Sequence, residues 1–200
     1  ASGQPVVGDW VLATHGLGDW WIEQTLDAFT RLSRRTPSGS QLLASNVDSA
    51  LLLMGLDNDF NPRRMERYIA LVRACGVEPV MVLTKLDIGT EVAHRIAQLR
   101  QRIPDDVTLL HLIPSEQTDA GVLAPWLGAG QTLVLLGSSG VGKSTLTNAL
   151  SGSLQATGGT RHGDDRGRHT TTTRSLHRCP GGACIIDTPG LRGLKPTGEE

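Results

Sequence analysis

The stretch GSSGVGKS, at residues 137–144, fits the pattern G-x-x-x-x-G-K-[ST] at every position. The apolar run TLVLL at residues 132–136 precedes it and predicts a short buried strand. The segment KSTLTNALSG, at residues 143–152, predicts a helix. A strand, a glycine-rich loop and a helix in this order form a phosphate-binding loop (P-loop), so the sequence predicts a polyphosphate site here.

Each residue type in the loop suits that chemistry. Glycines at positions 137, 140 and 142 let the backbone adopt positive φ and approach a ligand, so that N–H groups surround a polyphosphate. The helix N-terminus adds partial positive charge. Lys143 can reach the β- and γ-phosphates, and the Ser144 hydroxyl can ligate Mg²⁺. We therefore assign these residues to a nucleotide: Gly137, Ser138, Ser139, Gly140, Val141, Gly142, Lys143, Ser144 and Thr145.

Length and composition exclude several classes of protein. The 200 residues suffice for one ordinary domain with a small appendage, and 19 basic against 20 acidic residues give no global attraction to nucleic acid. No apolar run approaches a membrane span, and the first residues, ASGQPVVGDW, lack the features of a signal peptide. The three cysteines show no CxxC spacing. We expect a cytoplasmic monomer with reduced thiols and no membrane partner.

The first part of the chain, residues 1–43, differs from the rest. It contains three of the four tryptophans, and VVGDWVLA and WWIEQTL predict two short strands around a glycine-rich turn. Two strands cannot form an independent core. This segment therefore either packs against the main domain or belongs to a small β-domain whose other strands lie outside the chain.

Residues 44–200 alternate between strand and helix patterns. Strands are predicted at residues 47–55, 77–83, 107–113 and 132–136, with helices at 62–75, 90–102, 121–127 and 143–152. Asn61 and Pro62 are typical of a helix start. Such alternation predicts an α/β fold with a mostly parallel sheet and helices on both faces. Ligands of these sheets bind beyond the carboxyl ends of the strands.

After the P-loop helix comes a polar segment at residues 155–173, and long loops of this kind are usually functional. TRSLHRC and ACIID, joined by PGG, then predict a β-hairpin that ends in DTPG at residues 187–190. Asp187 can complete a Mg²⁺ shell, and the Gly190 N–H can meet a γ-phosphate.

Two further clusters follow predicted strands. In TKLD, at residues 84–87, the Asp87 carboxylate could accept hydrogen bonds from both N1–H and the 2-amino group of guanine, and the stem of Lys85 could cover the base. In PSEQTDAG, at residues 114–121, backbone N–H groups near Ser115 could meet the guanine carbonyl.

Together, TKLD, PSE, GSSGVGKS, GRHTTTT and DTPG resemble the five motifs of the GTPase superfamily in a permuted order, with the base motifs before the P-loop. This order closely resembles the RsgA/YjeQ family of bacterial GTPases that act in late assembly of the small ribosomal subunit. The resemblance implies an N-terminal OB-fold, of which residues 1–43 would be a part, a circularly permuted P-loop GTPase domain at residues 44–200, and a C-terminal zinc domain. No Cys/His cluster follows DTPG, so zinc is expected only outside this chain and the chain is expected to be a fragment or a trimmed member.

The resemblance implies Asn where this chain has Thr84, and threonine offers fewer hydrogen bonds to connect the loop with the P-loop. Leu191 stands where many GTPases use glutamine to orient water. His169 is the best candidate for that role, and the resemblance points to the same histidine; the alternative is an exposed structural or rRNA-contacting histidine. Among Thr170–Thr173 we favour Thr171 as the Mg²⁺ ligand.

Five arginines against two aspartates at residues 161–178 suit contact with RNA phosphates. The resulting hypothesis is a Mg²⁺-dependent GTPase whose GTP or GDP state controls binding to the small ribosomal subunit and its rRNA. The alternatives are a P-loop ATPase or kinase, and an RNA-binding assembly module in which the nucleotide is structural and turnover is negligible.

Overall fold

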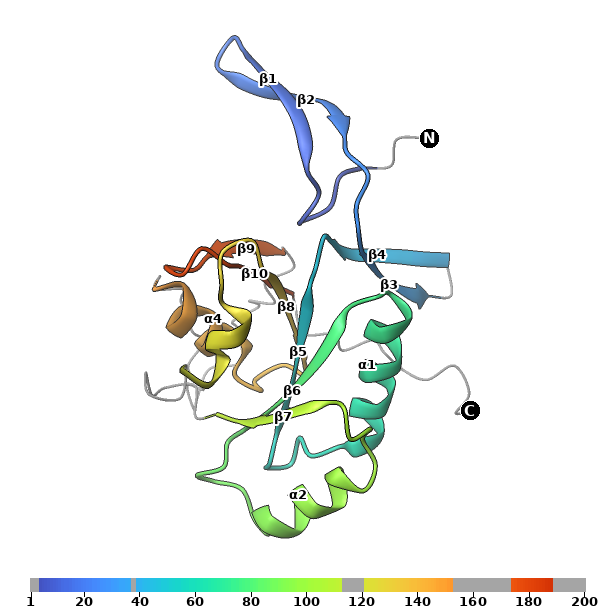
Figure 1. Cartoon of the computed structure of the whole chain (residues 1–200), viewed down its shortest axis with the longest axis vertical. Helices are drawn as coiled ribbons and strands as arrows, with labels where there is room; N and C mark the ends of the chain where they lie inside the picture. The colour runs from blue at the N-terminus through green and yellow to red at the C-terminus, as the bar shows by residue number, and fades with distance from the viewer. Residues whose placement is uncertain (1–3, 37–38, 113–120, 153–173, 189–200) are drawn as a thin grey trace, which may run out of the picture.

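A six-stranded sheet forms the centre of the computed structural model, which describes residues 4–36, 39–112, 121–152 and 174–188 (Figure 1). The strand order is β7-β6-β5-β8-β10-β9, and every neighbouring pair is parallel except β10 and β9. The prediction of a mostly parallel sheet is therefore confirmed. The strands are β5 (Ser49–Gly55), β6 (Glu78–Thr84), β7 (Thr108–His111), β8 (Thr132–Gly137), β9 (Ser175–Arg178) and β10 (Cys184–Asp187).

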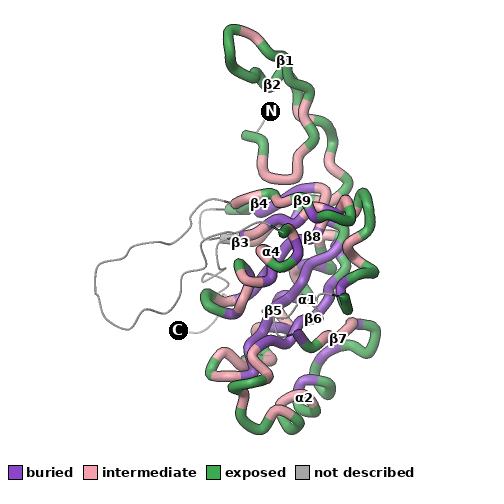
Figure 2. The backbone as a smooth tube through the Cα atoms, turned by 90° about the vertical axis from the view of Figure 1, so that its left-hand side faces the viewer, coloured by how far each residue is buried: buried purple, intermediate pink, exposed green. Residues whose placement is uncertain are grey.

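Helices cover both faces of this sheet, as the alternating pattern predicts. On one face, α1 (Pro62–Ala74) and α2 (Val92–Arg100) pack with Leu52 and Met54 of β5. On the other face, the 3-10 helix η1 (Gly121–Trp126) and α4 (Lys143–Ser151) pack with Leu51 and Leu53. Every residue of β5 is buried, as Figure 2 shows along the central strands, because β5 lies between two strands and two layers of helices.

The start of α1 follows the sequence signals closely. The Asn61 side chain accepts a hydrogen bond of 3.0 Å from the backbone N–H of Arg64, and Pro62 occupies the first helical turn. Gly76 follows the helix with φ +72°, a conformation that glycine adopts without steric cost.

Two β-hairpins precede the sheet. The first, β1 (Val11–Gly16) with β2 (Asp19–Thr25), was predicted and extends away from the rest of the molecule (Figure 1). Trp10, Trp20 and Trp21 remain 68%, 71% and 64% exposed on and beside it.

The sequence patterns missed the second hairpin, β3 (Arg31–Thr36) with β4 (Gly39–Ser45). Leu32, Leu43 and Ala44 from this hairpin are fully buried and join the core of the α1 face. The second hairpin therefore packs against the main domain. The division of the chain at residues 43 and 44 stays a prediction, and β4 continues across it.

The parallel strands bring four loops to one edge of the sheet. β5, β6, β8 and β10 end there at Gly55, Thr84, Gly137 and Asp187. Within the described ranges, no helix has both the length and the apolar character needed to cross a membrane.

Candidate nucleotide-binding site

The P-loop connects β8 to α4 at this edge, as the sequence predicts. Gly140 and Gly142 have φ values of +76° and +107°, so glycine is required at both for backbone reasons. Gly137 differs, and the expectation of a positive φ there is wrong. A β-carbon at Gly137 would lie 2.8 Å from Leu53 O and 3.0 Å from Val141 Cγ1, so glycine is required because the loop packs closely on β5.

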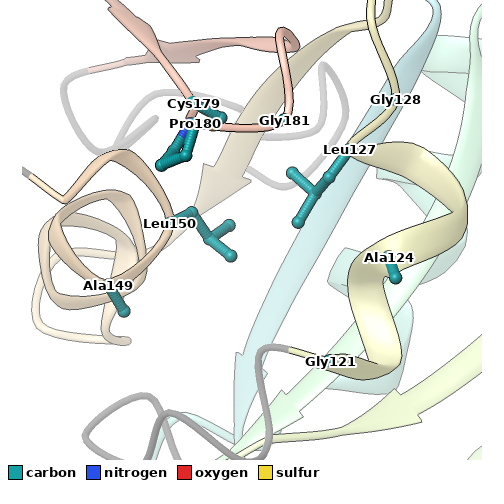
Figure 3. Close-up of a pocket in the computed structure, with 9 residues that line it drawn as sticks. All are labelled: Gly121, Ala124, Leu127, Gly128, Ala149, Leu150, Cys179, Pro180 and Gly181. Atoms are coloured by element: carbon teal, nitrogen blue, oxygen red, sulfur yellow. The ribbon is translucent and has the colours of Figure 1, made fainter.

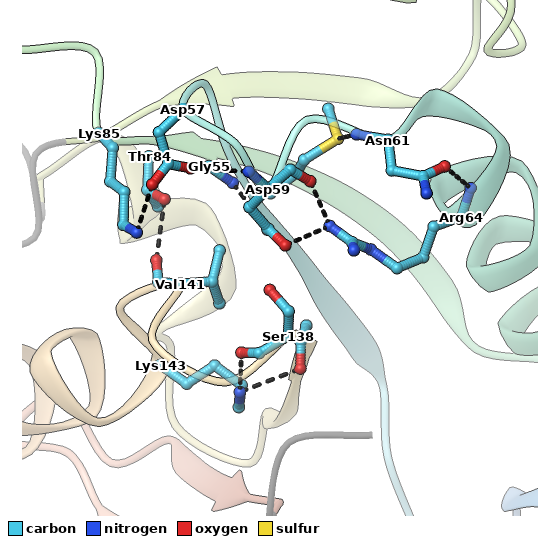
Figure 4. A network of polar contacts seen from close by, with 12 residues as sticks. Gly55, Asp57, Asp59, Asn61, Arg64, Thr84, Lys85, Ser138, Val141 and Lys143 are labelled. Atoms are coloured by element: carbon cyan, nitrogen blue, oxygen red, sulfur yellow. Dashed lines mark hydrogen bonds and ion pairs between the residues drawn. The ribbon is translucent and has the colours of Figure 1, made fainter. Parts of the chain in front are cut away.

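Lys143 lies across the inside of the loop. Its side chain is almost entirely buried, and Nζ donates to Gly137 O at 3.0 Å and to Ser138 O at 2.6 Å (Figure 4). The Ser138 hydroxyl oxygen is buried and has no hydrogen-bond partner among the residues that the structure describes. A buried ammonium and a buried hydroxyl beside a turn of glycines suit a phosphate, which would accept hydrogen bonds from both.

The carboxylate of Asp187, at the end of β10, lies beside the first turn of α4. Burial raises the pKa of Asp187 above its ordinary value, while the charges of Lys143 and His177 and a hydrogen bond from the Ser144 side chain lower it by less. Asp187 and Ser144, both predicted as Mg²⁺ ligands, are therefore brought together. Hard oxygen donors beside one another suit Mg²⁺, whose charge would offset the burial of the carboxylate. Within the described part of the chain, no group of three or more His, Cys, Asp or Glu side chains is placed to hold a metal.

Thr84, at the end of β6, connects the TKLD loop to the P-loop. Its side chain is fully buried, and Oγ1 donates to Val141 O at 2.8 Å (Figure 4). The threonine therefore keeps a direct hydrogen bond between the two loops. Asp87 lies in the following turn and is exposed, so its carboxylate is accessible to a ligand.

Lys85 takes part in an ion pair that the sequence patterns did not indicate. Its Nζ lies 2.7 Å from Asp57 Oδ2, just beyond the end of β5. Because residues that follow parallel strands share one edge, Asp57 could have been singled out by the same rule that selected TKLD.

Four predicted site residues lie outside the described residues: Ser115, His169, Thr171 and Gly190. Among the described ones, the structure brings together the P-loop, Thr84, Lys85 and Asp187.

A separate cavity of about 510 Å³ lies near the amino ends of β8 and β10, at the opposite end of these strands from the P-loop (Figure 3). Its lining is mostly apolar and comes from three places: η1 and the residues after it, the end of α4, and the β9–β10 turn with Cys179 and Gly181. The cavity is therefore distinct from the phosphate site.

A P-loop at the carboxyl edge of a parallel sheet, with a carboxylate from a neighbouring strand beside its serine, defines a P-loop nucleotide-binding protein. The family model described as RsgA GTPase matches residues 25–196. The chain belongs to the RsgA GTPase family.

Relatives and solved structures agree with this assignment. The chain is 47% identical over 196 residues to the small ribosomal subunit biogenesis GTPase RsgA of Xylella fastidiosa strain 9a5c, covering 98% of this chain and 57% of the relative. It is 46% identical over 194 residues to the same-named protein of Xanthomonas oryzae pv. oryzae strain PXO99A, covering 92% of this chain and 53% of the relative. The chain thus spans somewhat more than half the length of these curated relatives.

Among solved structures, YjeQ from Thermotoga maritima matches with a TM-score of 0.69 and 25% identity, covering 94% of this chain and 62% of that one. YloQ, described as a circularly permuted GTPase, matches with a TM-score of 0.58 and 26% identity, covering 98% of this chain and 61% of that one. The predicted permuted GTPase fold is therefore confirmed.

Proposed function

We propose that this chain is the GTP-binding and GTP-hydrolysing part of a cytoplasmic assembly factor for the small ribosomal subunit. The hydrogen bond of 2.8 Å between Thr84 and Val141 carries this proposal. It joins the loop that would recognise the base to the loop that would bind the phosphates, as a single nucleotide requires. The name of the relatives, small ribosomal subunit biogenesis GTPase, supports the choice of partner.

In this proposal, the exposed Asp87 recognises guanine through N1–H and the 2-amino group. Adenine cannot form that pair of hydrogen bonds, because its N1 is an acceptor and it lacks the amine. Lys85 lies along the base, and backbone N–H groups near Ser115 bind its carbonyl. Selectivity for GTP over ATP therefore depends mainly on one carboxylate.

The P-loop and Lys143 bind the β- and γ-phosphates, and the Gly190 N–H binds the γ-phosphate. Ser144, Asp187 and Thr171 would hold Mg²⁺, which neutralises charge on the β- and γ-phosphate oxygens when it is bound. His169 orients the attacking water, because Leu191 has no polar group for that task. The arginines at residues 161–178 contact rRNA, and this contact couples binding to the subunit with hydrolysis.

The test is the hydrolysis of GTP and of ATP by the full-length protein, with and without small ribosomal subunits. We expect GTP turnover that subunits stimulate, and ATP turnover at least about tenfold slower, because adenine cannot form the hydrogen bonds that guanine donates to the charged carboxylate of Asp87. Asp87→Ala should remove the preference for GTP. The matched control is Asp105→Ala, which removes another exposed aspartate in a turn, beside β7.

Two results would contradict parts of the proposal. Equal turnover of ATP and GTP would exclude the role of Asp87 and favour a P-loop ATPase. Normal binding and release of subunits by a Lys143→Ala variant without turnover would instead favour an RNA-binding module in which the nucleotide is structural.

A further inference from the structure

A polar network beyond the end of β5 contacts the base-recognition loop, and none of the nucleotide-binding roles above explains it (Figure 4). Asp57 is its centre. One carboxylate oxygen, Oδ1, accepts a hydrogen bond of 3.1 Å from the Asp59 N–H, and the other, Oδ2, lies 2.7 Å from Lys85 Nζ. Both oxygens are occupied, so the carboxylate has one fixed orientation.

The network is anchored in α1. The Asp59 carboxylate forms an ion pair of 2.8 Å with Arg64 and accepts a hydrogen bond of 3.3 Å from the Gly55 N–H. Arg64 also donates to Asp59 O at 2.6 Å. Asp57 is therefore held by a turn that is itself fixed to a helix of the core.

The α2 side holds the same turn. Arg95 donates to Leu56 O and, at 2.8 Å, to Asp57 O, and its guanidinium lies 5.3 Å from the centre of the Phe60 ring. The backbone next to Asp57 is thus fixed independently of its carboxylate. Removing that carboxylate would leave the turn in place.

Lys85 is the residue that this arrangement controls. Its backbone has φ +59°, a left-handed conformation that non-glycine residues rarely adopt. Its side chain passes so close to the end of β5 that a β-carbon at Gly55 would lie 3.3 Å from Lys85 Cδ and 2.5 Å from Asp57 Oδ1. Glycine at position 55 leaves room for the ion pair, and the pair holds Lys85 in a specific direction.

We propose that Asp57 is a positioning residue for base specificity: by holding Lys85, it fixes the loop in which Asp87, two residues later, presents its carboxylate to guanine. The inference rests on the proposed function, since it assumes a guanine nucleotide. Asp57 acts through Lys85 and does not contact the base.

The test compares the affinities of the full-length protein for GDP and for inosine diphosphate (IDP), which lacks the 2-amino group. Asp57→Asn keeps the shape of the side chain and removes its charge. We expect about three- to tenfold weaker GDP binding, the range for a partly exposed charged hydrogen bond, and a smaller preference for GDP over IDP. In a Lys85→Met background, Asp57→Asn should change GDP affinity by less than about twofold, because the partner is already absent.

Asp106→Asn is the matched control, since Asp106 forms an ion pair of 2.7 Å with Arg73 away from the sheet edge. It should leave both affinities unchanged. If Asp57→Asn does not fold, Asp57→Ser replaces it, because serine keeps an acceptor for the Asp59 N–H and still lacks the charge.

Unchanged or tighter GDP binding by a folded Asp57 variant would overturn the inference, because the ion pair with Lys85 would then contribute nothing to the recognition of guanine. The inference would also be overturned if Asp57→Asn weakened GDP binding equally in the wild-type and Lys85→Met backgrounds. Wild-type protein that binds ADP as well as GDP would overturn the proposed function and the inference together, whereas a selective wild type with an unaffected Asp57 variant would overturn the inference alone.

Discussion

The hydrogen bond from Thr84 to Val141 can be removed with little change in shape by Thr84→Val. Valine keeps the volume and the β-branched form that suit a strand, and it lacks only the hydroxyl that donates to Val141 O at 2.8 Å. Thr84 is fully buried, so no water replaces the lost donor. An unpaired buried acceptor costs about 1–3 kcal/mol. We expect the free energy of unfolding of the nucleotide-free protein to fall by about 1–2 kcal/mol.

Nucleotide binding should weaken as well, because the same bond joins the base loop to the P-loop. We expect GDP affinity to fall by about three- to tenfold, the equivalent of one hydrogen bond. Urea unfolding with and without GDP and Mg²⁺ measures both effects, since GDP stabilises the folded state according to its affinity.

The control is Thr30→Val. The Thr30 hydroxyl donates to Val47 O and accepts from Val47 N, both at 2.8 Å, away from the P-loop edge. This variant should lose stability and keep its GDP affinity. If Thr84→Val retains both wild-type stability and wild-type GDP affinity, the connection between the loops contributes nothing, and the observation that carries the proposed function fails.

Three further outcomes are expected. Lys143→Ala should abolish GTP turnover and weaken GTP binding by at least about tenfold, as measured by titration, because a charged donor to phosphate is lost. Asp187→Asn should abolish Mg²⁺-dependent turnover and yet raise the stability of the nucleotide-free protein at neutral pH, since burial raises the pKa of Asp187 and opposes its charge. Asp57→Asn should lower stability at neutral pH by at most about 1 kcal/mol. Partial burial raises the pKa of Asp57, but hydrogen bonds from Lys85 and the Asp59 N–H outweigh it, so the pKa lies below 3.8. The stability from this pair is fully present above pH 3.8 and is lost as the pH falls through the lowered pKa, where unfolding curves of the variant and the wild type should converge.

Local sequence signals predicted much of the fold and the strand-loop-helix order of the P-loop. The start of α1 at Asn61 and Pro62 and the strand-loop-helix of the P-loop depend on residues within a few positions of one another. Hydrophobic patterns placed the central strands within a few residues, because each of β5, β6 and β8 contains an apolar run of four or more residues.

Long-range contacts account for what the sequence patterns missed. The β3–β4 hairpin has few apolar residues, and its contribution to the core comes from Leu32, Leu43 and Ala44 once they meet the α1 face. The Asp57–Lys85 pair joins residues 28 positions apart on two different loops. No local pattern shows that Lys85 meets a carboxylate there. The sequence therefore indicated only that the Lys85 stem could cover the base, and gave no partner for its ammonium group.

The site also shows why β5 matters although none of its residues is assigned to the nucleotide. β5 lies between β6 and β8 in the sheet, so the base loop and the P-loop start two strand spacings apart, about 10 Å. The loops after β6 and β8 must therefore meet over the end of β5 for Thr84 to form its hydrogen bond with Val141. Two glycines without positive φ make room for the side chains and backbone that crowd together there. Gly55 leaves room for the Lys85–Asp57 pair, and Gly137 lets the P-loop pack on Leu53 O. Because this contact depends on the order of strands in the sheet and not on their order in the chain, the permuted sequence can form the same joined site with the base loop before the P-loop.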